Sequence, residues 1–218
     1  TKKQIGSTSK PLYDYGPGIE YNNWSTYQLF ADEPHSYSDG GNVNNADGRY
    51  NGLLTMREAL KLSRNIPAIK AFQSLKSSDI LSFVKSLGLN PDMSQGILFE
   101  THAIGGYTGE SPLTLAAAYA AFSNGGYYVE PRSFTKIVYR DTDEVYEVKT
   151  APQKVMSEET AYMISDMLVT TASYYTGRTT VNGVTYGLKT GTTDYDSATK
   201  KAYKLPGNAT NDLWVAGI

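Results

Sequence analysis

The sequence predicts an α+β fold in which helices flank an antiparallel sheet. Several segments place apolar residues at helical spacing directly after a residue type that caps helices, as at Thr55 and Ser111. Near the C-terminus, two short β-prone runs, 187–193 and 213–216, are separated by a polar, turn-rich segment. Because helices that cover an antiparallel sheet bury the apolar surfaces of both, these elements together predict a layered α+β domain.

In the first third of the chain, a helix is expected to begin at or near Ser7. Residues 13–50 show no sustained period of 3.6 or 2, so we expect long connecting loops there. The capping box Thr55-Met56-Arg57-Glu58 predicts the start of the next helix. Because Ile66-Pro67 disfavours helical geometry just after Asn65, Ser63-Arg64-Asn65 should lie on a turn between two helices.

Four further helices and a small accessory sheet are expected between residues 67 and 186. The helices cover 67–75, 78–87, the segment from Ser111-Pro112 to Gly125-Gly126, and a segment that opens at Ser157. The third of these is almost entirely apolar, so we expect it to be buried. Runs of β-formers predict three strands of an antiparallel accessory sheet: 127–129, 134–139 and 145–148. One side of the last helix is expected in the core: Met163, Ile164, Met167 and Leu168.

The composition fits one domain that does not bind nucleic acid. The 218 residues are 40% hydrophobic, which is enough for a sizeable core. The 20 Lys and Arg residues nearly balance the 22 Asp and Glu residues, so no basic surface that attracts nucleic acid is expected. The absence of cysteine excludes disulfides and thiolate metal sites. No run of about 18 apolar residues is present, so nothing in this sequence is expected to span a membrane.

Ser7 and Lys10 form the first candidate catalytic pair. Residues three apart on a helix point the same way, so the Lys10 amine can take the proton that makes the Ser7 hydroxyl a nucleophile. The unpaired N–H groups of a first helical turn also favour a negative charge that develops beside Ser7. The Ser-x-x-Lys pattern occurs four times in the chain, so spacing alone does not select this pair.

Two further motifs distinguish Ser7 from the other matches. Ser63-Arg64-Asn65 is the only Ser-x-Asn in the chain, and Lys189-Thr190-Gly191 is the only Lys-Thr-Gly. Ser-x-x-Lys, Ser-x-Asn and Lys-Thr-Gly, in that order, are the motifs of penicillin-binding proteins and serine β-lactamases. The chain resembles this superfamily, and within it the transpeptidase domain of a class A, bifunctional penicillin-binding protein.

The resemblance extends from Gly6 to the strand around Trp214 and includes stretches outside the motifs. Two such stretches are Thr55–Leu60, which leads into the second motif, and Ala117–Gly126. One departure is Ser9, where relatives commonly carry a larger apolar residue. This departure bears on the packing of the first helix and leaves the chemistry of the first motif intact.

The resemblance implies a role for each motif residue in acyl transfer. Ser7 attacks the substrate carbonyl and becomes acylated, and Lys10, held neutral by burial or by nearby positive charge, takes its proton. Ser63 passes a proton to the departing amine, while Asn65 holds Lys10 and the substrate amide. Lys189 supplies a positive charge that binds the substrate carboxylate and keeps Lys10 deprotonated.

The third motif is also expected to bind substrate along a strand. The resemblance implies substrate contacts at Thr190, Gly191, Thr192 and Thr193, with the extended backbone pairing with the substrate as an added strand. By the same analogy, the N–H groups of Ser7 and Thr192 form the oxyanion hole. A glycine inside a strand often marks the close approach of a ligand or of another backbone, and Gly191 is in that position.

The implied reaction is the cross-linking of peptidoglycan stem peptides. Ser7 attacks the bond between two terminal D-alanines, D-alanine leaves, and the acyl group passes to an amine on a second stem. β-Lactam antibiotics imitate the donor and acylate the same serine. No metal and no cofactor is needed. His35 and His102 lack ligand-like spacing, so we interpret both as ordinary surface or loop residues.

Three alternative functions share these motifs. A D,D-carboxypeptidase uses water as the acceptor, and the motifs do not separate it from a transpeptidase. A class A β-lactamase needs an additional glutamate for deacylation, and no Glu-x-x-Leu-Asn segment lies between Ser63 and Lys189. A β-lactam sensor is acylated without turnover and needs no acceptor site.

We interpret residues 1–218 as a fragment of a transpeptidase domain, because Ser7 leaves no room for the strands that precede it in relatives. The resemblance places a glycosyltransferase domain and a membrane anchor upstream of this sequence. The expected location is the extracytoplasmic face of the bacterial membrane, with other cell-wall synthesis proteins as possible partners.

Overall fold

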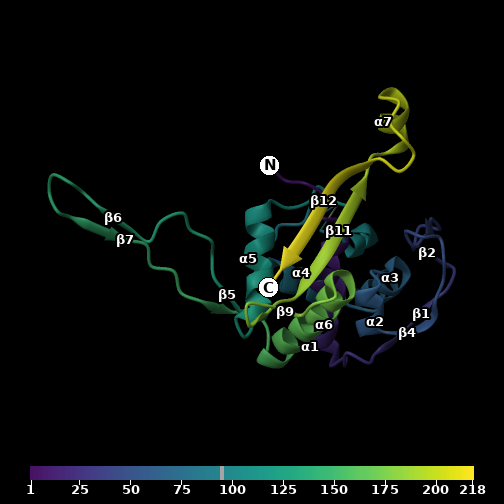
Figure 1. The fold of residues 1–218 in the computed structure, drawn as a ribbon, viewed down its shortest axis with the longest axis horizontal. Coiled ribbons are helices and arrows are strands. Elements are labelled where there is room, and N and C mark those ends of the chain that lie inside the picture. The colour runs from purple at the N-terminus through teal and green to yellow at the C-terminus, as the bar shows by residue number, and fades with distance from the viewer. Residues whose placement is uncertain (94–95) are drawn as a thin grey trace.

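The computed structural model describes residues 1–93 and 96–218 and has mixed helices and strands (Figure 1). The α-helices are α1 (Gly16–Asn22), α2 (Met56–Lys61), α3 (Asn65–Gln73), α4 (Ser77–Ser86), α5 (Pro112–Ser123), α6 (Glu158–Thr176) and α7 (Ser197–Ala202). Two 3₁₀ segments, η1 (Gly6–Ser9) and η3 (Glu100–Ile104), and one π-helical segment, η2 (Pro11–Tyr15), complete the helical elements.

The strands of the described residues form antiparallel pairs, which confirms the predicted α+β class. The pairs are β1 (Leu29–Asp32) with β4 (Gly52–Thr55), β2 (His35–Ser36) with β3 (Asn42–Val43), β5 (Tyr127–Tyr128) with β8 (Gln153–Lys154), β6 (Lys136–Val138) with β7 (Val145–Glu147), β9 (Thr180–Val181) with β10 (Val184–Thr185), and β11 (Leu188–Asp194) with β12 (Thr210–Gly217). The longest pair, β11 with β12, runs in register from Leu188 opposite Gly217 to Thr193 opposite Asp212. Figure 1 shows this pair lying across the helices.

The first helical segment is longer than predicted, because η1, η2 and α1 follow one another from Gly6 to Asn22. The prediction of loops over 13–50 is therefore wrong for residues 13–22, and also for β1, which pairs with β4. Gly16-Pro17-Gly18 is a composition that usually interrupts a helix. Pro17, however, lies in the first turn of α1, where no N–H is needed. A Cβ on Gly18 would lie 2.0 Å from the Trp24 ring, so close packing explains that glycine.

The turn between α2 and α3 carries Ser63 and Arg64, as predicted, whereas Asn65 is the first residue of α3. Thr55 and Glu58 form the complete capping box of α2. Helix α3 begins at Asn65, two residues before the predicted start, because Pro67 falls in the first turn, where a missing N–H costs nothing. Ser63 occupies the left-handed region with φ 55°, which is uncommon for a residue other than glycine.

Helices α5 and α6 begin and pack largely as predicted. Ser111 and Ser157 cap them, each accepting a hydrogen bond from a backbone N–H three residues on. Ile164, Met167 and Leu168 of α6 are fully buried, and Met163 packs against the same core. The expectation that α5 is buried on all sides is wrong, because the Leu113 side chain at its first turn is 63% exposed.

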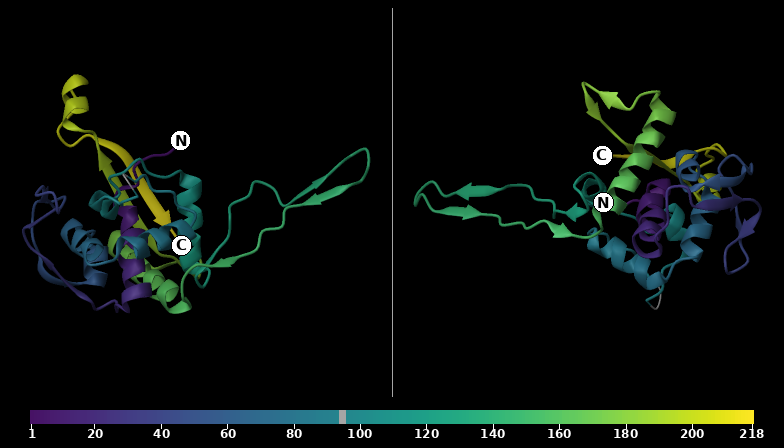
Figure 2. Two further views of the ribbon diagram at one scale, coloured as in Figure 1. Left: turned by 180° about the vertical axis from the view of Figure 1, so that it is seen from behind. Right: turned by 90° about the horizontal axis from the view of Figure 1, so that it is seen from below.

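The predicted accessory sheet is in fact a long arm made of two separate strand pairs. β5 pairs with β8 at its base, and β6 pairs with β7 near its tip. Both figures show the arm extending away from the helices (Figures 1 and 2). The residues of β6 and β7 are all exposed, so this hairpin contributes nothing to the core.

The segment after β11 also contains more structure than the predicted loop. Helix α7, capped by Asp196, lies within it, and β12 begins at Thr210 instead of Leu213. In Figure 1, α7 lies beyond the upper end of the β11–β12 pair. Within the described part of the chain, no helix is long and apolar enough to cross a membrane.

The core holds the first helical segment against β11. η1 packs on both β11 and η3, and α6 covers β11 as well. Ser9 is fully buried, and its hydroxyl donates to the Ala103 carbonyl at 2.7 Å. This hydrogen bond satisfies the buried Ser9 hydroxyl, so the first helical segment packs with a polar side chain at this position.

Candidate active site

The three motifs meet in one cleft of about 540 Å³. Ser7 enters it from η1, Ser63 and Asn65 from the turn that leads into α3, and Thr190 and Thr192 from β11. Residues that are 183 positions apart in sequence, Ser7 and Thr190, therefore line the same cavity. The structure brings together the residues that the motif pattern selected.

Lys10 lies buried beneath the cleft, with its amine held by the second motif. Its Nζ donates to the Ser63 carbonyl at 2.7 Å and to Asn65 Oδ1 at 2.8 Å, and lies 3.4 Å from Ser63 Oγ. The Lys10 backbone N–H donates to the Ser7 carbonyl, but among the described residues no hydrogen bond joins the Lys10 amine to the Ser7 hydroxyl. The side-chain hydrogen bond expected from the three-residue spacing is therefore absent.

Lys189 approaches the same serine from β11. It is fully buried, and its Nζ donates to Ser63 Oγ at 2.8 Å and to the Thr190 carbonyl at 2.9 Å. The Ser63 hydroxyl therefore lies between two lysine amines. A hydroxyl in this position can accept a proton from one amine while donating its own to another group.

Burial weakens the affinity of both lysines for a proton. It lowers the pKa of Lys189 to about 7. Burial, followed by the positive charge of Lys189, holds the pKa of Lys10 well below its ordinary value, and the Asp14 carboxyl opposes this shift. The predicted influence of Lys189 on Lys10 is thus present, but a pKa near 7 makes the charge of Lys189 dependent on pH.

Two glycines let η1 lie directly against β11. A Cβ on Gly191 would lie 2.3 Å from the Ile5 carbonyl oxygen, and a Cβ on Gly6 would lie 2.6 Å from the Thr192 carbonyl oxygen. Gly6 also has φ +54°, a conformation that favours glycine. The predicted close approach at Gly191 is confirmed as a backbone contact, and it brings the chain that precedes Ser7 beside Thr192.

The β11 side chains alternate between two environments. Thr190 and Thr192 line the cleft, whereas Gly191 and Thr193 are buried on the other face and are not among the cleft-lining residues. Thr193 is 7% exposed, and its hydroxyl is a buried oxygen without a hydrogen-bond partner in the described residues. Side-chain contact with a substrate therefore fits Thr190 and Thr192 and does not fit Gly191 or Thr193.

A polar network behind Asn65 was missed in the sequence. Asn45 Oδ1 accepts from the Asn65 N–H at 2.8 Å, and Asn45 Nδ2 donates to Asp32 Oδ1 at 2.7 Å. Asp32 is fully buried and pairs with Arg64 Nε at 2.8 Å, and Arg64 also pairs with Asp47 at 2.9 Å. Asp32, Asn45 and Asp47 lie in the segment predicted as loops, and no local pattern links them to Asn65.

Asp14 is a second residue that the motifs did not identify. It lies in η2, four residues after Lys10, and it is fully buried. Neither oxygen of its carboxyl has a hydrogen-bond partner among the described residues, and burial raises its pKa well above the usual value. The only sequence feature that could have indicated a role for Asp14 was its position four residues after Lys10.

His102 does not fit the interpretation as a surface or loop residue. It is fully buried in η3, where its ring stacks on Tyr107 with centroids 4.6 Å apart. Its Nδ1 hydrogen-bonds with the Phe99 carbonyl at 2.9 Å, and burial lowers its pKa. His35 is half-buried in β2 and hydrogen-bonds with Gln73. The contacts of both rings are structural.

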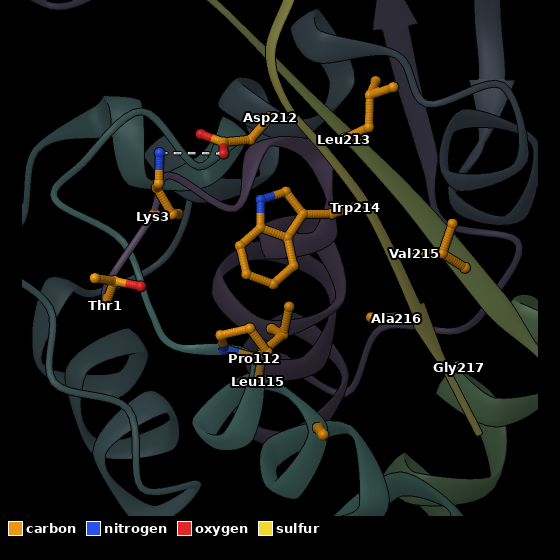
Figure 3. A pocket seen from close by; sticks show the side chains of 11 residues that line it. Thr1, Lys3, Pro112, Leu115, Asp212, Leu213, Trp214, Val215, Ala216 and Gly217 are labelled. Carbon is orange, nitrogen blue, oxygen red and sulfur yellow. Dashed lines mark ion pairs between the residues drawn. The ribbon is translucent and has the colours of Figure 1, made fainter.

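A second hollow lies between α5 and β12, away from the motifs (Figure 3). Its lining includes Leu115, Trp214 and Val215, and Lys3 forms an ion pair with Asp212 at 3.4 Å along its edge. None of the motif residues lines it. The candidate chemistry therefore belongs to the cleft beside Ser7.

The three motifs, brought together in one cleft of an α+β fold, agree with a family model. The model for the penicillin-binding protein transpeptidase domain matches residues 1–218. The chain belongs to this family.

The curated relatives that the chain resembles include penicillin-binding proteins of the 1A and 1A/1B types. It is 41% identical over 221 residues to penicillin-binding protein 1A/1B of Bacillus subtilis, covering 100% of this chain and 24% of that protein. It is 37% identical over 201 residues to penicillin-binding protein 1A of Streptococcus pneumoniae, covering 89% of this chain and 28% of that protein. The chain thus spans about a quarter of the length of these relatives. The predicted resemblance is confirmed.

Solved structures share the fold at low sequence identity. The penicillin-binding protein PonA1 of Mycobacterium tuberculosis superposes with a TM-score of 0.83 at 19% identity, over 100% of this chain and 57% of that one. A ceftriaxone acyl-enzyme complex of penicillin-binding protein A from the same organism gives a TM-score of 0.76 at 16% identity, over 90% and 48%. The chain therefore spans about half the length of these solved chains.

Proposed function

We propose that the chain carries a serine D,D-transpeptidase site that cross-links peptidoglycan stem peptides and is acylated by β-lactams at Ser7. The observation that supports this most strongly is the convergence of two buried lysine amines, Lys10 and Lys189, on the Ser63 hydroxyl beside Ser7. A structural role for two buried lysines is costly, whereas proton transfer needs amines with lowered pKa values.

Acylation begins when Ser7 Oγ bonds to the carbonyl carbon of the penultimate D-alanine. The hydroxyl proton passes to neutral Lys10, and the carbonyl oxygen gains the negative charge. The N–H groups of Ser7 and Thr192 are the proposed donors to this oxyanion, because η1 lies directly against β11 at that point. Loss of one such donor typically costs about 10²–10³ in rate.

Collapse of the intermediate breaks the peptide bond. The departing nitrogen takes a proton from Ser63 Oγ, which regains one from the adjacent lysine amine, and D-alanine leaves. An acceptor amine then attacks the acyl carbon, gives up its proton along the same path, and releases Ser7. No step consumes a cofactor.

The terminal carboxylate of the donor is assigned to the end of the cleft formed by the third motif. Thr190 and Thr192 line that part, and Lys189 lies beneath it. A bound carboxylate favours the charged form of Lys189, whose pKa is about 7 in the absence of substrate. Substrate binding thereby supplies the charge that keeps Lys10 neutral.

This assignment concerns the site alone, and the setting of the whole protein is a further part of the proposal. Because the relatives are penicillin-binding proteins of the 1A/1B type, we expect the site to work at the extracytoplasmic face of a bacterial membrane. A glycosyltransferase domain, a membrane anchor and contacts with other cell-wall synthesis proteins are expected from segments outside residues 1–218.

The test is a turnover assay with a diacetyl-L-lysyl-D-alanyl-D-alanine donor, with and without an amine acceptor. A transpeptidase releases D-alanine and forms the amide with the acceptor, and Ser7→Ala does neither. Release of D-alanine with only hydrolysed donor would identify a carboxypeptidase. Acylation by benzylpenicillin without any D-alanine release would identify a sensor, and rapid penicillin hydrolysis would identify a β-lactamase.

A further inference from the structure

The cleft face of β11 continues beyond the third motif to Asp194. Side chains of a strand alternate, and Thr190, Thr192 and Asp194 all line the cleft. At about 3.3 Å per residue, Asp194 lies about 7 Å past Thr192, which is the span of two residues. The strand pairing shifts between Thr193 and Asp194, and such irregularities re-aim the side chains near them.

The direction of the donor along β11 decides which of its residues faces Asp194. This inference rests on the proposed function. A donor that pairs antiparallel with β11, with its carboxylate at Lys189 and Thr190, runs its preceding residues toward Asp194. With the scissile carbonyl at Thr192, the residue before the two terminal D-alanines passes beside Asp194.

The charges of the cleft differ between its two ends. The amines of Lys10 and Lys189 lie beneath the motif end. Two carboxylates line the cleft, those of Asp47 and Asp194. Arg64 binds Asp47 at 2.9 Å and holds its pKa below the usual value, whereas no ion pair or hydrogen bond of the Asp194 carboxylate occurs among the described residues.

We propose that Asp194 is a specificity residue that binds a primary ammonium group on the donor residue preceding the two terminal D-alanines. An exposed carboxylate with no protein partner, at this distance from the scissile bond, complements a side chain that ends in an amine. The cationic end of the cleft then binds the donor carboxylate, and the anionic end binds the donor side chain. The two ends together fix the direction of the peptide.

A pair of peptides that differ in one charge tests this proposal. Nα-acetyl-L-lysyl-D-alanyl-D-alanine has a free side-chain amine, and the Nα,Nε-diacetyl peptide has none. The measurement is the concentration of each peptide that halves the rate of Ser7 acylation by benzylpenicillin. We expect the protein to favour the free amine by about three- to fivefold, as for an exposed ion pair.

The variants isolate the contribution of Asp194. Asp194→Asn should remove the preference, and Asp194→Lys should reverse it. The preference is the ratio of the two peptide concentrations measured on the same variant, so a change in the rate of acylation by benzylpenicillin itself does not affect it. The matched control is Asp196→Asn, which removes a charge two residues away. Asp196 caps α7, and asparagine caps equally well, so the preference should persist.

Two results would overturn the proposal. An unchanged protein that does not distinguish the peptides, or that does not bind them, would exclude an ammonium site. An Asp194→Asn variant that keeps the preference would assign it to another group. If benzylpenicillin acylated Ser7 neither in the unchanged protein nor in the variants, the proposed function would be overturned, and this inference with it.

Discussion

The most distinctive feature of the cleft is that two buried lysines, Lys10 and Lys189, lie within hydrogen-bond distance of the Ser63 hydroxyl. Each amine has acceptors around it: the Ser63 carbonyl and Asn65 for Lys10, and Ser63 Oγ and the Thr190 carbonyl for Lys189. These acceptors make burial of the amines tolerable, and burial in turn lowers both pKa values. The rate of Ser7 acylation should therefore depend on pH near neutrality.

Replacing Lys189 should move that pH dependence in a known direction. In the proposed mechanism acylation needs neutral Lys10, so its rate should fall as the pH drops through the pKa of Lys10. The charge of Lys189 lowers that pKa, so in Lys189→Gln the fall should begin at a higher pH. The measurement is the second-order rate of acylation by benzylpenicillin from pH 5 to 9, followed by intact mass.

The control for this experiment is Lys3→Gln, which removes an amine that pairs with Asp212 outside the cleft. Its pH profile should match that of the unchanged protein. A Lys189→Gln profile that stays in place, or that moves to lower pH, would show that Lys189 does not depress the pKa of Lys10.

Asp14→Asn should stabilise the protein, and more so at higher pH. Burial raises the pKa of this carboxyl in the folded state, so its contribution to stability is complete below the unfolded pKa and is lost as the pH rises through the folded value. The neutral amide avoids that loss. We expect a gain of about 1–3 kcal/mol at pH 8 and almost none at pH 4 in urea unfolding. A larger gain at pH 4 than at pH 8 would contradict this account.

At the residue scale, the motifs predicted which side chains line the cleft, but not the buried polar side chains around them. Ser7, Ser63 and Thr192 could be selected because their order and types are local sequence features. Asn45 could not, because its role depends on a hydrogen bond with Asn65, and Asp14 could not, because its burial depends on the packing of other elements around it. A buried polar side chain is recognisable only once its neighbours are known.

At the scale of elements, the site depends on the contact between η1 and β11. Gly6 and Gly191 leave no space for a side chain on either surface. This contact fixes the position of Ser7 relative to Thr190 and Thr192, which a separate helix and strand could not do. Geometry of this kind controls rate, because a displacement of about 1 Å can cost about 10².

Gly191→Ala should therefore reduce acylation of Ser7 by about 100-fold. The added methyl would lie 2.3 Å from the Ile5 carbonyl oxygen, so η1 must move away from the strand. The matched control is Gly207→Ala, where a Cβ meets nothing within 4 Å. The measurement is the acylation rate together with the urea midpoint. Equal rates in the two variants would show that the contact does not position Ser7.

Helix starts were the elements most readily predicted from sequence. Thr55, Ser111 and Ser157 all cap helices, because capping is decided within four residues. The extension of the first helix to Asn22 was missed, since Gly16 and Gly18 weaken the helical pattern and are explained only by their contacts with Phe83 and Trp24. Tertiary packing decides such segments.

At the scale of the whole molecule, a helical body carries the cleft and an exposed arm extends from it (Figure 2). The arm, residues 127–154 from β5 to β8, contributes no residue to the cleft. Its outer pair, β6 with β7, has two strands and no supporting layer, and isolated hairpins are marginally stable in water. The arm should therefore open more readily than the body.

Limited digestion with trypsin should first cut the arm, at Lys136, Arg140 or Lys149, which are all exposed. The nicked protein should still bind benzylpenicillin, because the cleft residues lie elsewhere. Fragment masses identify the cut, and the mass of the adduct reports the site. First cuts within α3 or α4, at Lys70 or Lys85, would contradict this view of the arm.

The central claim, that Ser7 is the nucleophile of the cleft, has a direct measurement. The protein and Ser7→Ala are each incubated with benzylpenicillin, and intact mass is followed by peptide mapping. The account predicts one stable adduct per chain, located on Ser7 and absent from the variant. An adduct on another residue, or an equal adduct in Ser7→Ala, would contradict it.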